Sequence, residues 1–253
     1  MWNFPKIIAH RGGGTLAPEN TMAAMRCGLS YGFRAVEFDV MLSREGIPVL
    51  MHDPQFGRTV RGSGKVCESS VQELRAMDAG AWFGAKFAGE PVPTFDQVVD
   101  FCKDNRIWMN IEIKPSPGFE AQTGRVVAEA TNRLFADEVA AHGGVPDTSL
   151  PLFSSFSFDA LVAAKSVAPA IPRGYLLDQI PPDWLDRMRA LDAVAVHTNH
   201  KKLSPEQVAA IKTQGFGLFC YTVNDPVRAK EILGWGVDAF CTDRIDLIGP
   251  SFA

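Results

Sequence analysis

Short apolar segments alternate with helix-like segments along most of this chain, and no other feature of the sequence restricts the possible folds as strongly. Eight apolar segments are strand candidates, at residues 7–10, 36–40, 108–113, 151–154, 173–177, 193–197, 216–223 and 239–242. Helix-like segments lie between them, at residues 21–32, 94–105, 123–141, 158–168, 182–190, 205–213 and 226–235. Eight βα units in 253 residues are typical of a TIM barrel. We therefore expect an α/β fold with (β/α)8 barrel architecture.

A further apolar segment, residues 47–52, is expected to be the antiparallel return strand of a hairpin and not a ninth unit of the barrel. A two-residue Glu-Gly loop after Arg44 would place that residue opposite Ile47. Counting back along the ladder then places Asp39 opposite His52, close enough for their side chains to touch.

No flexible linker, low-complexity tract or run of like charge divides the chain, so we expect one domain over residues 1–253. Its composition, 46% hydrophobic and 21% charged, suits a globular domain with a substantial core. The stretch at about 53–93 is rich in Gly, Ser and charged residues, and we interpret it as a small insertion after strand 2, near the mouth of the barrel. A doubly wound open sheet is the alternative, although it rarely needs eight regular units.

The charge and the cysteines indicate the surroundings in which the protein works. A net charge of −4 argues against a nucleic-acid partner, and an anionic substrate would need positive charge supplied locally. The five cysteines form no CxxC pair and most lie in apolar runs, which favours reduced thiols and a reducing compartment. No segment is long and apolar enough to span a membrane, so no stable membrane association is expected. Strand-like sequence begins by Lys6, which leaves no room for a signal peptide and favours a cytoplasmic location.

Polar residues follow or end nearly every strand candidate. In a TIM barrel the carboxyl ends of all strands meet at one rim, where active sites are built. We therefore expect the following residues to converge: His10, Arg11, Glu37, Asp39, Glu112, Lys114, Ser154, Ser155, His197, Asn199, Tyr221, Asn224, Thr242 and Asp243.

Three carboxylates on adjacent strands, Glu37, Asp39 and Glu112, predict a metal site. Carboxylates that close cannot all stay ionised without a compensating cation. Ligation by oxygen alone selects a hard ion, Mg²⁺ or Ca²⁺, and does not choose between them. The alternative is a buried ionic network in which Glu37 and Glu112 pair with Arg11 and Lys114, but buried ion pairs seldom offset their desolvation cost.

Two histidines, His10 and His52, each follow an apolar strand and converge on the acid cluster. One imidazole can deprotonate a nucleophile while the other protonates a leaving oxygen, so we predict a general acid–base pair. Arg11 and Lys114 supply positive charge beside the metal, which suits an anionic phosphoryl oxygen. Gly residues 12–14 allow the backbone to approach a ligand closely.

Aromatic residues provide candidates for an apolar wall. Tyr221, Trp82 and Phe83 are placed to contact the organic part of a substrate, although core packing explains Trp82 and Phe83 almost as well.

Taken in order, the motifs resemble those of the glycerophosphodiester phosphodiesterase family over essentially the whole chain. They are Ala9-His-Arg-Gly12, Ala17-Pro-Glu-Asn-Thr21, Glu37-Phe-Asp39, His52-Asp53, Asn110-Ile-Glu-Ile-Lys114, Ser154-Ser-Phe156, Tyr221-Thr-Val-Asn224 and Cys241-Thr-Asp243. The compact form of the chain is most similar to the cytosolic bacterial branch of that family.

The resemblance implies a TIM barrel that uses a divalent metal to hydrolyse glycerophosphodiesters, such as glycerophosphocholine or glycerophosphoethanolamine, to sn-glycerol 3-phosphate and an alcohol. It implies that Glu37, Asp39 and Glu112 bind the metal and that His10 and His52 are catalytic. It also implies that Arg11 and Lys114 contact phosphate. Relatives often have Trp where this chain has Tyr221, which preserves an aromatic wall beside the substrate.

Two other functions remain as alternatives at this point. The first is a lysophospholipase D or sphingomyelinase D type of activity, which would need an apolar path for an acyl chain; residues 58–70 show no apolar lid. The second is a catalytically silent barrel that only binds phosphodiesters. The sequence leaves open the preferred alcohol, the order of the two histidine roles, the nucleophile (water or a substrate hydroxyl) and the oligomeric state.

Overall fold

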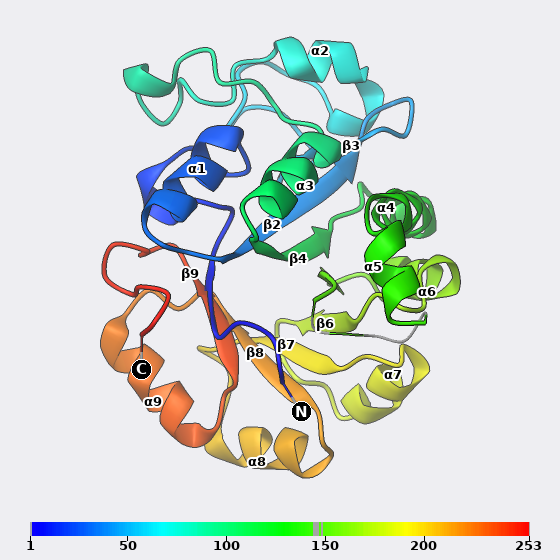
Figure 1. Cartoon of the computed structure of the whole chain (residues 1–253), viewed down its shortest axis with the longest axis vertical. Helices are drawn as coiled ribbons and strands as arrows, with labels where there is room; N and C mark the ends of the chain where they lie inside the picture. Colours follow the sequence, from blue (N-terminus) through cyan, green and yellow to red (C-terminus); the bar gives the residue numbers. More distant parts are fainter. Residues whose placement is uncertain (1, 144–146, 148, 253) are drawn as a thin grey trace.

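Eight parallel strands close into a ring in the computed structural model, which describes residues 2–143, 147 and 149–252 (Figure 1). They are β1 (Ile7–Ala9), β2 (Ala35–Leu42), β4 (Trp108–Ile113), β5 (Leu152–Ser155), β6 (Arg173–Leu177), β7 (Ala195–Asn199), β8 (Gly217–Tyr221) and β9 (Ala239–Thr242). β1 pairs with both β2 and β9, and this pairing closes the ring. The predicted TIM barrel is therefore confirmed, and the open sheet is excluded.

Helices connect successive strands around the barrel. They are α1 (Met22–Ser30), α3 (Phe95–Asp104), α4 (Glu120–Leu134), α5 (Ala136–Ala141), α6 (Phe158–Val167), α7 (Trp184–Ala190), α8 (Pro205–Thr213) and α9 (Pro226–Trp235). The side chains of Thr21, Ser204 and Asp225 accept backbone hydrogen bonds in the first turns of α1, α8 and α9, which fixes where these helices start. The single helix expected over 123–141 is divided, because Phe135 leaves the helical conformation at φ −116° and ψ 23°.

The chain between β3 (Pro48–Leu50) and α3 forms a small insertion over the α1 and α3 side of the barrel, drawn in cyan to green in Figure 1. It contains η2 (Val66–Glu68), η3 (Ala85–Phe87) and a helix that the sequence reading missed, α2 (Val71–Ala76). Its apolar residues pack against the hairpin in one cluster, made by Met41 of β2, Val49 of β3, Met51, Val60, Val66, Leu74, Ala79 and Val92. The Glu90 carboxylate accepts a hydrogen bond of 2.8 Å from the Ala23 backbone N–H, which ties the insertion to the start of α1.

The hairpin of β2 and β3 is antiparallel as expected, but its predicted register is wrong by one residue. Val40 pairs with Leu50, and the Met51 N–H donates to the Asp39 carbonyl, so Asp39 lies opposite Met51 and not His52. The cause is a loop of three residues and not two. Gly46, at φ +79°, takes the left-handed conformation that such a loop requires and donates its N–H to the Ser43 carbonyl.

Below the rim, the barrel interior is closed by apolar side chains and one histidine. His197, on β7, is completely buried, stacks at 4.5 Å from the Phe219 ring, and has no hydrogen-bond partner for either ring nitrogen among the described residues. Burial lowers the pKa of His197 to about 3. Gly174 on β6 makes room for this ring, since a Cβ there would lie 2.2 Å from its Nε2.

Two expectations about the surroundings of the protein can be compared with the structure. All five cysteines are free, as predicted. None of the helices in the described ranges has the length and apolar character needed to cross a membrane.

Candidate active site

A cavity of about 190 Å³ opens at the carboxyl ends of the barrel strands. Its lining includes seven of the eight residues singled out as site residues: His10, Arg11, Glu37, His52, Glu112, Lys114 and Tyr221. The eighth, Asp39, is 1% exposed and lies beneath the others, in contact with Arg11 and Lys114. The structure thus brings all eight together, from five different parts of the chain.

The three predicted metal-binding acids form one cluster. Glu37 and Asp39 are two residues apart on β2 and so point to the same face, and Asp39 lies beside Glu112 of β4 in the sheet register. One carboxylate oxygen from each lies within 4.8 Å of the others. Burial raises the pKa of both glutamates, and the charge on Asp39 raises it further. The three carboxylates therefore cannot all stay ionised together without a compensating cation.

The donor set fits a hard divalent cation. Glu37 Oε1 is buried and has no hydrogen-bond partner in the described structure, which leaves one ligand oxygen available at the centre of the cluster. The acid cluster is compatible with a divalent metal site, and its all-oxygen chemistry matches Mg²⁺ or Ca²⁺.

The cationic side chains of Arg11 and Lys114 form ion pairs with Asp39 and not with Glu37. Lys114 Nζ lies 3.3 Å from Asp39 Oδ1 and also 3.3 Å from Glu112 Oε1, while Arg11 Nε lies 3.5 Å from Asp39 Oδ2. Asn20 Nδ2 donates to Asp39 at 2.8 Å. Although burial opposes it, these partners lower the pKa of Asp39. The ionic network considered from the sequence therefore exists around Asp39 and Glu112, but it does not extend to Glu37 Oε1.

His10 is held by a carboxylate from the opposite end of the chain. Its Nδ1 lies 2.5 Å from Asp243 Oδ1, and its Nε2 lies 3.7 Å from Glu37 Oε2. Asn224 Nδ2 donates to the other Asp243 oxygen at 2.9 Å and fixes that carboxylate. Burial alone would lower the pKa of His10, but the hydrogen bond to Asp243 and the charge of Glu37 raise it overall.

His52 has a carboxylate partner of its own. Its Nδ1 lies 2.6 Å from Oδ1 of the adjacent Asp53, whose second oxygen accepts a 2.6 Å hydrogen bond from Arg58 Nε. The two other guanidinium nitrogens of Arg58 donate to Glu19, at 2.6 and 2.7 Å, and Glu19 accepts from Arg11 Nη1 at 2.6 Å. Burial and the nearby cations Arg11 and Lys114 lower the pKa of His52, although the Asp39 charge opposes them.

The glycines after Arg11 have a role in packing, and the close approach of their backbone to a ligand remains a prediction. Each one allows close packing within the protein: a Cβ on Gly12 would meet Ala24 of α1 at 3.0 Å, and one on Gly14 would lie 2.1 Å from the Asp243 carbonyl. Arg11 itself has φ 51°, and its backbone N–H donates to Glu37 Oε2 at 3.1 Å. The loop thus places Arg11 and Asp243 beside the acid cluster.

Aromatic rings form one wall of the cavity. Tyr221 packs edge-to-face against Phe156 with ring centroids 5.6 Å apart, and the Tyr221 hydroxyl donates to the Leu177 carbonyl. Phe156 also lines this cavity and is 47% exposed.

Several residues that shape the site were missed as partners by the sequence reasoning. They are Asn20, Asp53, Arg58 and Phe156, together with Asp243 as the partner of His10. Asp53 could have been found from its position next to His52, and Asp243 from its position directly after the last strand. No sequence signal points to Arg58, since nothing in the sequence relates the insertion to Glu19.

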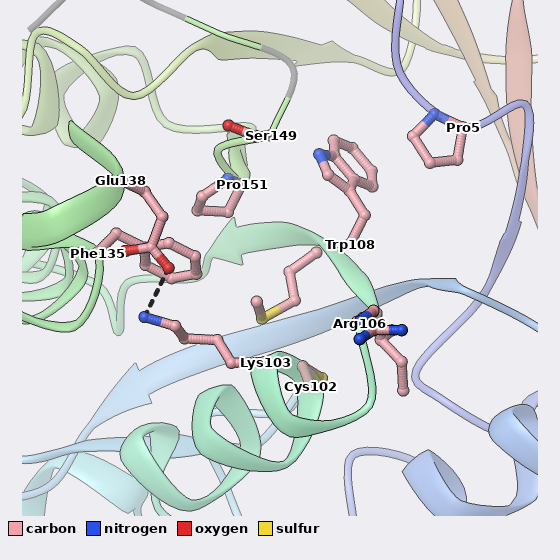
Figure 2. A pocket seen from close by; sticks show the side chains of 11 residues that line it. Pro5, Cys102, Lys103, Arg106, Trp108, Phe135, Glu138, Ser149 and Pro151 are labelled. Atoms are coloured by element: carbon pink, nitrogen blue, oxygen red, sulfur yellow. Dashed lines mark ion pairs between the residues drawn. The ribbon is translucent and has the colours of Figure 1, made fainter. Parts of the chain in front are cut away.

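A second cavity, of about 370 Å³, lies at the amino ends of β4 and β5, away from the site (Figure 2). Its lining includes Pro5, Arg106, Trp108 and Pro151. Two further lining residues, Lys103 and Glu138, form an ion pair with each other, with 2.8 Å between Nζ and Oε1. This face of a TIM barrel serves stability, whereas catalysis takes place at the carboxyl ends of the strands. We therefore assign the chemistry to the smaller cavity.

Comparison with known proteins agrees with this arrangement. The model of the glycerophosphoryl diester phosphodiesterase family matches residues 10–247. The chain belongs to this family. It is accordingly an enzyme, a phosphodiesterase, as the sequence resemblance predicted.

Three of its relatives are similar over nearly their full length. A glycerophosphodiester phosphodiesterase of Caldanaerobacter subterraneus is 32% identical over 94% of this chain and 93% of the relative. The structure of a phosphodiesterase from Oleispira antarctica, in complex with the product sn-glycerol-3-phosphate, is 35% identical with a TM-score of 0.85, covering 95% of this chain and 93% of that one. A glycerophosphodiester phosphodiesterase structure from Agrobacterium tumefaciens is 28% identical with a TM-score of 0.75, covering 96% and 98%.

Proposed function

We propose that this phosphodiesterase hydrolyses glycerophosphodiesters to sn-glycerol 3-phosphate and an alcohol, with a divalent metal and two catalytic histidines. One observation carries the proposal: two imidazoles, each hydrogen-bonded through Nδ1 to its own carboxylate, line the same cavity as the acid cluster. The product bound to the Oleispira antarctica relative supports the choice of substrate.

Glu37, Asp39 and Glu112 would hold the metal, Mg²⁺ or Ca²⁺. When bound, such an ion supplies Lewis-acid polarisation of the phosphoryl oxygens. Arg11 and Lys114 remain partly available at the cavity wall and stabilise the negative charge that grows on the phosphoryl oxygens as the nucleophile attacks. Tyr221 orients the organic part of the substrate against an aromatic face.

Proton transfer is assigned to the Nε2 atoms of His10 and His52. Because Nδ1 of each ring is engaged by Asp243 or Asp53, Nε2 is the nitrogen left to exchange a proton with the substrate. One Nε2 accepts the proton of the nucleophile and the other donates a proton to the departing alcohol oxygen. The carboxylates hold each ring in one orientation and stabilise the imidazolium that forms.

The lysophospholipase D alternative would need room beyond the catalytic cavity. That cavity, at about 190 Å³, accommodates a small polar group and not an acyl chain. The catalytically silent alternative is set aside, because the chain belongs to a family of enzymes and retains both histidines and all three acids.

The experiment that tests the proposal is the hydrolysis of glycerophosphocholine and glycerophosphoethanolamine, with release of glycerol 3-phosphate as the readout. It is run with Mg²⁺, with Ca²⁺ and with EDTA. We expect release that requires metal, and a fall in kcat of roughly 10²- to 10⁴-fold for His10→Ala and for His52→Ala with the fold retained. Near-full activity of either variant would contradict the assignment of that histidine to acid–base catalysis. Release of glycerol 3-phosphate in EDTA at the same rate as with metal would contradict the proposed metal requirement.

A further inference from the structure

A third cavity, of about 370 Å³, adjoins the active site on the side of the insertion. It shares His10 and Arg11 with the catalytic cavity, so these two residues form the partition between the two spaces. Its lining also includes Trp82 and Phe83 of the insertion, together with Glu19 and Asp243, which bond to Arg11 and His10.

This shared partition leaves two spaces within reach of a phosphodiester, which carries two ester arms on one phosphorus atom. The catalytic cavity, at about 190 Å³, has roughly half the volume of its neighbour, at about 370 Å³. The arrangement offers the smaller space to one arm and the larger space, on the side of the insertion, to the other.

The two aromatic rings are presented by a well-fixed loop. The Asp78 carboxylate accepts backbone hydrogen bonds from Gly80, Ala81 and Gly89, at 2.8 to 2.9 Å. Trp82 Nε1 donates to the Ala79 carbonyl at 2.8 Å, and the Phe83 ring packs edge-to-face on the Trp82 ring with centroids 5.5 Å apart. Trp82 remains 38% exposed, so part of its ring is accessible and not buried in a core. Phe83 is partly buried and packs also against Phe87, so the pair offers the cavity one exposed ring supported by a second.

The chemistry of this surface favours an ammonium group. The electron-rich faces of Trp and Phe attract cations, and quaternary ammonium groups are bound in proteins by such rings. The carboxylates add less, because Glu19 already accepts from Arg11 and Arg58, and Asp243 is shared with His10 and Asn224. Selectivity for an ammonium group would therefore depend on the rings of Trp82 and Phe83.

We propose that Trp82 and Phe83 form the subsite for one ester arm of the substrate, the alcohol that is released, and that this subsite prefers alcohols bearing an ammonium group. The inference rests on the proposed function and adds to it the class of alcohol. A zwitterionic diester is then matched along its length, with its phosphate at Arg11 and its cation at the aromatic pair.

The test compares two esters that differ in charge and not in shape. Glycerophosphocholine is measured against the 3,3-dimethylbutyl ester of glycerol phosphate, in which a carbon replaces the quaternary nitrogen. We expect the wild-type kcat/KM for the choline ester to exceed that for the neutral ester by roughly fivefold or more. Trp82→Ala should reduce this ratio toward one, mainly by raising KM for the choline ester, and Trp82→Phe should restore part of it.

The matched control is Tyr31→Ala, an aromatic side chain that is 47% exposed at the end of α1 and lies outside both cavities. It should leave both rates unchanged. Equal rates on the two esters in the wild type, or an equal loss on both in Trp82→Ala, would overturn the subsite while leaving hydrolysis of glycerophosphodiesters established. Failure to cleave either ester, from folded and metal-loaded protein, would instead overturn the proposed function and the subsite with it.

Discussion

Arg58 donates two hydrogen bonds to the carboxylate of Glu19, at 2.6 and 2.7 Å, across 39 residues of sequence. A third bond, from its Nε, reaches Asp53 at 2.6 Å. Asp53 in turn holds His52, and Glu19 holds Arg11. One side chain of the insertion therefore links the supports of a proposed catalytic histidine and a proposed phosphate-binding arginine. Its planar, forked guanidinium matches this geometry in a way that a lysine cannot.

From this linkage we expect Arg58→Lys to lower kcat by roughly 10- to 100-fold, the range found when groups that orient site ligands are removed. The reason is that His52 and Arg11 lose their fixed orientation, while the acid cluster is untouched. Steady-state kinetics on glycerophosphocholine measure the effect, with kcat and KM determined separately.

The control for Arg58 is Arg61→Lys, because Arg61 is an exposed arginine of the same insertion and lines neither the catalytic cavity nor its neighbour. Combining Arg58→Ala with Asp53→Asn should cost little more than Arg58→Ala alone, since the first change already frees both Asp53 and Glu19. Additive losses would show that Asp53 supports His52 independently of Arg58.

Metal binding should stabilise the fold even when no substrate is present. Glu37 Oε1 lacks a partner, and the buried acids repel one another, so a cation binds the folded state far better than the unfolded chain. At a metal concentration about 100 times Kd, the free energy of unfolding should rise by about 2.7 kcal/mol. Thermal unfolding with Mg²⁺, Ca²⁺ or EDTA measures this shift, and Glu37→Gln should abolish most of it. A Tm that does not respond to either metal would contradict the site.

Stability should fall on mild acidification because of His197. The pKa of His197 is about 3 in the folded protein, against an ordinary value of 6.5. Below pH 6.5 the unfolded state therefore binds a proton at this imidazole that the folded state does not bind. The stabilisation is complete above pH 6.5 and is lost as the pH falls toward the folded pKa. By pH 5 the loss reaches about 2 kcal/mol.

Urea unfolding of the wild type and of His197→Gln, at pH 7.5 and at pH 5, measures how much His197 contributes to the pH dependence of the unfolding free energy. The wild type should lose about 2 kcal/mol more than the variant between the two conditions. Parallel losses in both proteins would mean that other groups cause the acid sensitivity.

Replacing Gly14 should damage both the fold and the site. At φ +52° the residue takes the left-handed conformation, and an added Cβ would lie 2.1 Å from the carbonyl oxygen of Asp243, the partner of His10. Gly143→Ala is the matched control, with φ +63° and open space around the new Cβ. We expect a loss of about 1 kcal/mol for Gly143→Ala and clearly more for Gly14→Ala. Only Gly14→Ala should also lower kcat, which activity assays on refolded protein would show.

The sequence predicted the barrel well because each strand is a short apolar run with polar residues at its end, and that pattern is local. β4, β9, α8 and α9 have the bounds predicted for them, Trp108–Ile113, Ala239–Thr242, Pro205–Thr213 and Pro226–Trp235. The register of the hairpin was missed, because it depends on Gly46 adopting a positive φ, which adds one residue to the loop. Helix α2 was missed because its six residues are too few to show a period.

The site was predictable in its residues and less so in its contacts. Topology alone brings Glu37, Asp39 and Glu112 together, once the strands are placed in order. The contacts of His10 with Asp243 and of Arg58 with Glu19 depend on side-chain geometry across distant segments, which no local pattern encodes. The roles of these residues, the single-domain organisation and the cytoplasmic location remain predictions.

The hydrogen bond between His10 and Asp243 joins positions 233 residues apart, each directly after the end of the first or the last strand of the ring. The three acids, by contrast, are all present once the chain has been made as far as Glu112. A chain that has not yet added β9 to its sheet lacks the carboxylate that orients its first histidine. Under the role proposed for His10, catalytic turnover therefore requires the completed ring, and we expect it to report barrel closure more strictly than helix content does.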